Sequence, residues 1–70
     1  MTATAAPAAQ ELSYAEARGI LAAFVRALAM DPYDAATILT DLDGGGTDRA
    51  TLADIIDGTG YPNLVPDVLG

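Results

Sequence analysis

The sequence contains no cysteine and no histidine, and it has no apolar run of the length that crosses a membrane. The first two absences exclude disulfide frameworks, zinc centres and histidine-based acid–base catalysis within the chain. Residues 1–10 have neither the basic start nor the long apolar stretch of a signal peptide. We therefore expect a soluble, cytoplasmic protein.

Positive charge is also scarce. Ten acidic residues stand against three arginines and no lysine, which gives a net charge of −7 at pH 7. Residues 1–30 sum to zero, whereas residues 31–70 hold eight aspartates and a single arginine. Such a field repels nucleic-acid phosphates and anionic membranes and attracts basic protein surfaces. We expect neither nucleic acid nor membrane as a partner, although solubility alone explains the acidity equally well.

The length of 70 residues allows one domain at most, and a chain of this size buries only roughly 60% of its unfolded surface. Residues 1–11 are small, polar and without pattern, which predicts a disordered tail. Residues 12–70 then form a single small helical domain. The predicted fold class is all-α, a three- to four-helix bundle.

The first predicted helix covers residues 14–30. Ser13 and Glu16 have the spacing of a capping box, in which each side chain accepts the backbone N–H of the other residue. Apolar residues then recur every three or four positions and form one stripe, as in an amphipathic helix.

The second predicted helix covers residues 32–42. Asp31 is suited to cap it and Pro32 to its first position. Gly44–Gly46 are expected to end it, because glycine adopts the left-handed conformation without steric cost.

The third predicted helix covers residues 48–57. Thr47 is expected to cap it and Gly58 to stop it. A short amphipathic turn over residues 64–69 follows a segment of turn composition. Because the chain stops at Gly70 directly after two apolar residues, we expect an N-terminal piece of a longer protein.

The stretch TDLDGGGTDRATLADI over residues 40–55 could be a site or a joint. Asp41, Asp43 and Gly46 match positions one, three and six of a calcium loop, but Leu52 stands where the twelfth-position carboxylate is needed. A phosphate loop needs a lysine after its glycines, and Asp48 is there instead. We interpret the stretch as a joint and expect no metal site.

The same outline is similar to carrier proteins, which attach phosphopantetheine to a serine after such a loop. No serine lies in this stretch, since Ser13 is the only one in the chain. A degenerate carrier-like domain and an EF-hand or dockerin-like calcium module therefore stay as alternatives. A third alternative is an acidic nucleic-acid mimic that inhibits a basic protein.

With no pocket-forming size and no activated nucleophile, we expect no catalysis, no catalytic residue and no cofactor. The predicted function is protein–protein interaction through an acidic, partly apolar helical surface. The partner is expected to be a basic or amphipathic protein segment, or a second copy in a homodimer. The residues expected to contact it are Arg26, Asp34, Asp41, Asp48, Asp54, Asp57, Leu64 and Val68.

The LAAFVRALAM segment followed by DPYDAATILTDL, together with the free-looking Met1 and the end at Gly70, resembles the helical docking domains of modular polyketide and nonribosomal peptide synthases. The resemblance covers the general pattern of residues 12–58 and no diagnostic motif. It implies a domain that pairs with a segment of opposite charge to order successive subunits in biosynthesis.

Overall fold

The computed structural model describes residues 11–70. The predicted tail over residues 1–11 lies outside this range except for Glu11, which belongs to a short strand. The described elements are β1 (Glu11–Leu12), α1 (Tyr14–Arg26), α2 (Pro32–Leu42), β2 (Thr47–Asp48), α3 (Arg49–Gly58), the 3-10 helix η2 (Pro62–Leu64) and α4 (Val65–Leu69).

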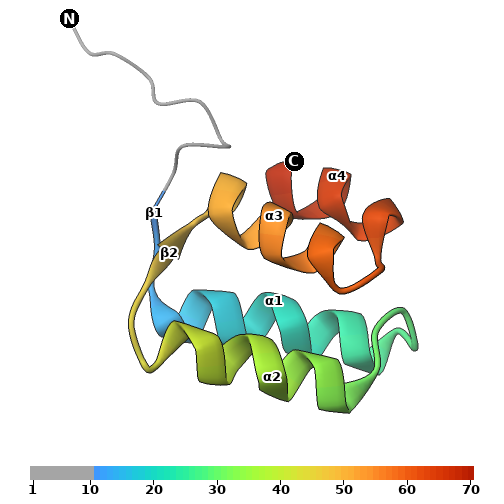
Figure 1. Ribbon diagram of the computed structural model, residues 1–70, viewed down its shortest axis with the longest axis horizontal. Helices are drawn as coiled ribbons and strands as arrows, with labels where there is room; N and C mark the ends of the chain where they lie inside the picture. The colour runs from blue at the N-terminus through green and yellow to red at the C-terminus, as the bar shows by residue number, and fades with distance from the viewer. Residues whose placement is uncertain (1–10) are drawn as a thin grey trace, which may run out of the picture.

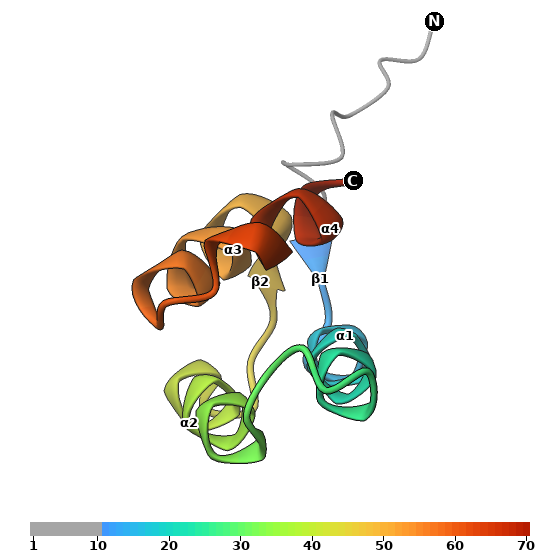
Figure 2. The ribbon, with the colours of Figure 1, turned by 90° about the vertical axis from the view of Figure 1, so that its right-hand side faces the viewer.

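The helices form two packed pairs (Figure 1). α1 and α2 run antiparallel as one hairpin, and α3 packs against η2 and α4 as the other. Seen end-on, α2 and α3 lie on one side of the molecule and α1 and α4 on the other (Figure 2). The prediction of a small helical bundle is confirmed.

The core lies between the two hairpins. The largest fully buried side chains come from all four helices: Leu21, Ile38, Leu52, Ile56 and Val68. Smaller or less buried apolar groups complete the core: Leu12, Ala17, Met30, Ala35, Ala53 and Leu64.

The start of α1 is as predicted. Ser13 Oγ accepts the N–H of Glu16 at 3.1 Å, and Glu16 Oε1 accepts the N–H of Ser13 at 2.9 Å. This reciprocal pair satisfies two backbone donors that the first helical turn leaves without partners.

The predicted end of this helix at residue 30 is wrong, since α1 ends at Arg26. Leu28 adopts a left-handed conformation with φ 58°. Its N–H donates to Val25 O at 3.0 Å, and the next N–H, of Ala29, donates to Phe24 O at 2.9 Å. These two bonds define a Schellman motif, which closes a helix and turns the chain. The apolar spacing extends past this turn in the sequence, since Met30 is buried as well, and it therefore predicted too long a helix.

α2 has the predicted bounds. Asp31 Oδ1 accepts the N–H of Tyr33 at 2.7 Å, as expected of an N-cap. The helix end differs in detail from the prediction, because Asp43 is the first left-handed residue, with φ 54°, and Gly44 follows with φ 78°. Aspartate tolerates this conformation better than most side chains do.

α3 begins one residue later than predicted, and Asp48 rather than Thr47 caps it. Thr47 belongs instead to β2, which pairs antiparallel with β1 in the register Glu11↔Asp48 and Leu12↔Thr47. Neither strand was predicted. The pairing ties the start of the first hairpin to the start of the second.

The predicted turn over residues 64–69 is present as the end of η2 and the whole of α4. Its apolar residues Leu64 and Val68 point into the core, with exposed fractions of 4% and 0%. The guanidinium of Arg49 donates to Val68 O at 2.7 Å, so a cation satisfies a carbonyl at the C-terminal end of α4.

Gly46 and Gly19 form a matched pair for testing the fold. A Cβ at residue 46 would lie 2.5 Å from Leu12 O, whereas a Cβ at Gly19 would meet nothing within 4 Å. We expect Gly46→Ala to destabilise the protein by about 1–3 kcal/mol, because the backbones of β1 and β2 must separate. Gly19→Ala should stabilise it by about 0.5–1 kcal/mol. Urea unfolding followed by circular dichroism measures both, and equal stability of the two variants would contradict the strand pairing.

Candidate interaction surface

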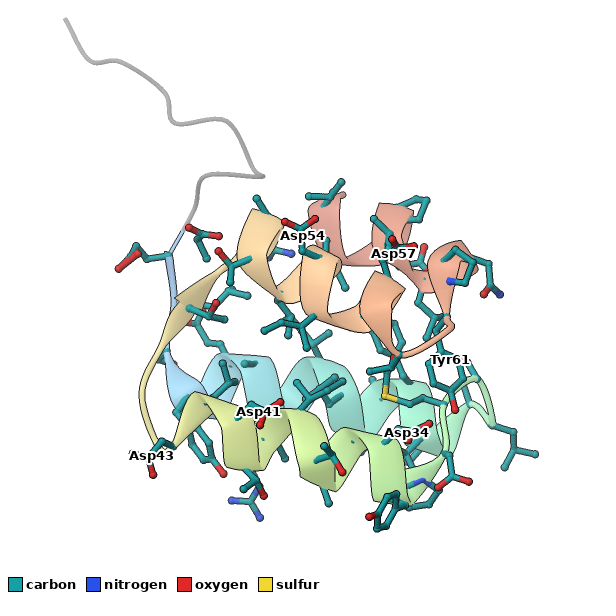
Figure 3. The ribbon with its side chains drawn as sticks, viewed as in Figure 1. Asp34, Asp41, Asp43, Asp54, Asp57 and Tyr61 are labelled. Carbon is teal, nitrogen blue, oxygen red and sulfur yellow. The ribbon has the colours of Figure 1, made fainter. Side chains whose placement is uncertain are left out.

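Aspartates are spread along α2 and α3, the two helices that lie on the same side of the molecule (Figure 2). Asp34, Asp41 and Asp43 lie along α2 and at its end, and Asp54 and Asp57 lie along α3 (Figure 3). All of them are exposed except Asp34, which is half-buried. We name these five residues the acidic side.

None of the three arginines lies on α2. Arg18 and Arg26 are exposed on α1. Arg49 starts α3, but its guanidinium is partly buried and bonded to the C-terminal end of α4. Within residues 11–70, charge is therefore divided by helix: net negative along α2 and its flanks, and near balance on α1. The predicted contact residue Arg26 is the last residue of α1 and so belongs to a different helix from the predicted aspartates.

Asp34 takes part in a connection that was not predicted. The Tyr61 hydroxyl donates to Asp34 Oδ2 at 2.8 Å and accepts the N–H of Asp31 at 3.1 Å. The ring thus joins the segment before η2 to the start of α2, as Figure 3 shows for Tyr61 and Asp34. In the sequence, Tyr61 lies within a Gly- and Pro-containing turn, and this composition gives no indication that its hydroxyl bonds to α2.

The environment of this hydroxyl changes its acidity. The hydrogen bond from the N–H of Asp31 is the largest single influence on the pKa of Tyr61, and it lowers that pKa. The bond that the hydroxyl donates to Asp34, its desolvation and the charges of both aspartates together outweigh that effect and raise the pKa above its ordinary value. Tyr61 therefore stays protonated and keeps donating to Asp34 across the neutral range.

Asp48 is committed to the helix that follows it. Its Oδ1 accepts the N–H of Thr51 at 2.6 Å. That backbone hydrogen bond lowers the pKa of Asp48 below its ordinary value, and the side chain of Thr51 adds a smaller effect in the same direction. Asp48 was predicted to contact a partner, but its geometry is that of an N-cap.

Leu64 and Val68 were also predicted to contact a partner. Both are buried in the core between the hairpins, so neither presents a surface to another protein. The sequence could not separate them from surface residues, because an amphipathic turn has the same spacing whether its apolar side faces its own core or a partner.

The loop between α2 and α3 has the geometry of a joint. Gly44 makes the left-handed turn, Gly46 passes close to the backbone of Leu12, and β2 follows at once. Within residues 11–70, no three carboxylates are grouped as metal ligands. Asp48, the nearest carboxylate after the glycines, is bonded to the backbone of Thr51.

Within the part of the chain that the structure describes, two large apolar side chains are exposed and were not predicted as site residues. Leu28 in the turn after α1 is 93% exposed, and Tyr33 in the first turn of α2 is 78% exposed. Both belong to the end of the first hairpin, at the start of the acidic side. The apolar spacing of residues 14–30 instead predicts that Leu28 shares the buried stripe, whereas the left-handed turn leaves its side chain exposed.

Comparisons of the chain with protein-family models, with curated proteins and with solved structures find no match. None of the helices over residues 11–70 combines the length and the apolar character needed to cross a bilayer.

Removal of the Tyr61 hydroxyl tests the connection between the two hairpins. We expect Tyr61→Phe to reduce the free energy of unfolding by about 1–2 kcal/mol, because the variant loses one donated and one accepted hydrogen bond. Tyr33→Phe is the control, since that ring is mostly exposed, and it should change stability by less than about 0.5 kcal/mol. Urea unfolding of both variants makes the comparison, and an equal effect would argue against the connection.

Asp48→Asn tests the cap through pH. Asparagine also caps helices but does not titrate. Because the folded pKa of Asp48 is lowered, its ionised form stabilises the fold above the unfolded pKa, and this contribution is lost as pH falls through the folded value. The stability of the wild type relative to the variant should therefore decrease between about pH 5 and pH 2. A difference that is constant across urea unfolding curves at these pH values would show that the carboxylate is not the cap.

Proposed function

We propose that the protein is a non-catalytic interaction module whose acidic side, along α2 and α3, binds a basic segment of another protein. The observation that supports this proposal is the separation of charge. Asp41, Asp43, Asp54 and Asp57 are exposed on neighbouring helices, and the one arginine of α3 is directed to α4. A partner that brings cations to this side would relieve repulsion among the carboxylates.

The interior supports the same proposal in a different way. Leu52, Ile56 and Val68 are fully buried between the hairpins, and Ile55, Val65 and Leu69 pack against that core while half-buried. The exposed side chains of α3 are therefore small, polar or charged, with Asp54 and Asp57 among them. Binding through charge gives rapid association and specificity for sign, and it weakens as salt screens the charges. The resemblance to synthase docking domains is consistent with this mode and stays a prediction.

The test compares two double variants that change net charge equally. Asp41→Asn with Asp54→Asn neutralises one carboxylate on each helix of the acidic side. Glu11→Gln with Asp67→Asn neutralises two exposed carboxylates on β1 and α4. The probe is a fluorescent synthetic helix with leucines on one face and arginines on the other, and its anisotropy reports binding.

We expect the acidic-side variant to weaken binding by about threefold to tenfold at low salt, as for two exposed charge pairs. The control variant should weaken binding less, because its carboxylates lie away from the bound peptide. Equal losses would mean that only net charge matters, and would contradict a binding side on α2 and α3.

A further inference from the structure

The turn after α1 contains a leucine where backbone geometry favours glycine. Leu28 is the left-handed residue of the Schellman motif, with φ 58°. Glycine, or sometimes asparagine, is the usual residue there, because a Cβ is crowded in this conformation. The side chain gains nothing in return, since it is 93% exposed. Such a residue is unfavourable both for backbone conformation and for contact with water, and outliers of this kind motivate a functional hypothesis.

The exposed face of α2, the helix that follows this turn, includes a stripe of low polarity. Tyr33, Thr37 and Thr40 follow the spacing that puts residues on one helix face. Thr37 Oγ1 donates to Tyr33 O at 3.0 Å, and Thr40 Oγ1 donates to Ala36 O at 2.9 Å. Because both hydroxyl protons are directed to the helix's own carbonyls, this face can be covered without leaving a hydroxyl donor unpaired.

Carboxylates line one edge of that stripe. Asp34 and Asp41 are seven residues apart, so they lie on the same edge of α2 about two turns from each other. α2 itself contains no cation, and Arg26, the last residue of α1, lies outside it. The turn and the face of α2 thus present the exposed side chain of Leu28, the exposed ring of Tyr33 and, along one edge, two carboxylates.

We propose that Leu28, Tyr33 and the outer face of α2 seat the apolar side of a cationic amphipathic helix, whose basic residues meet Asp34 and Asp41. This inference rests on the proposed function and specifies where and how the partner binds. Charge complementarity selects this occupant: a second copy of the chain would bring another acidic α2 and a net charge of −7 to the same face.

Leu28→Gly separates binding from folding. Glycine suits the left-handed position, so we expect the thermal midpoint to rise by about 4–8 °C. Binding of the leucine–arginine helix should weaken by about tenfold, at both low and high salt, because an apolar contact is lost. Tyr33→Thr should weaken binding in the same way. A version of the peptide with serines in place of the leucines is the control, and Leu28→Gly should not alter its weaker binding.

Three outcomes would overturn the inference. If Leu28→Gly leaves affinity unchanged while Asp41→Asn with Asp54→Asn lowers it, the apolar anchor is wrong and the proposed function stands. If neither variant changes affinity, both fail. If sedimentation shows a dimer of the free protein that Leu28→Gly abolishes, the occupant is a second copy rather than a cationic helix.

Discussion

The structure depends on contact between two helix hairpins that are too small to be stable separately. α2 has 11 residues and α4 only five, and isolated helices of such lengths are marginal in water. They persist because Ile38 and Val68 are fully buried against side chains of α1 and α3. Two devices fix the pairs to each other at opposite ends: the β1–β2 pairing with its close passage at Gly46, and the Tyr61 hydroxyl between Asp34 and Asp31.

The core also determines what the surface can offer. Leu64 of η2 and Val68 of α4 are buried in the core, whereas Val65 and Leu69 of α4 pack against it and stay half-buried. Charge then distinguishes the helices, and α2 and α3 carry most of the exposed aspartates. Among residues 11–70, Leu28 and Tyr33 are the two large apolar side chains left exposed, and both lie at the start of the acidic side. That coincidence makes one partner with both apolar and basic groups a simpler explanation than separate roles.

The starts of α1 and α2 could be predicted from the sequence, and the end of α1 could not. Starts depend on side-chain caps such as Ser13 and Asp31, whose type and spacing are visible in the sequence. The end of α1 depends on a backbone turn that usually signals itself by glycine, and Leu28 gives no such sign. The apolar spacing also predicted too late an end for α1, because Met30 is buried although it lies after the turn. The two strands have two residues each, too short for alternation to be recognised.

The candidate surface was only partly predictable for similar reasons. Exposed aspartates were identified correctly as surface groups at Asp41, Asp54 and Asp57. Asp34 is bonded to a tyrosine 27 residues away, and Asp48 is bonded to the backbone of its own helix. These two roles could be identified only from the three-dimensional structure. Leu64 and Val68 were misassigned because burial is a property of the whole fold and not of a five-residue segment.

The most direct test of the account is a nuclear magnetic resonance titration of the full chain with the cationic amphipathic peptide. The account predicts that amide resonances change along residues 28–41 and around Asp54 and Asp57, while those of α4 and of Arg18 stay in place. Changes centred on α1 and α4, or spread evenly over the molecule, would contradict it.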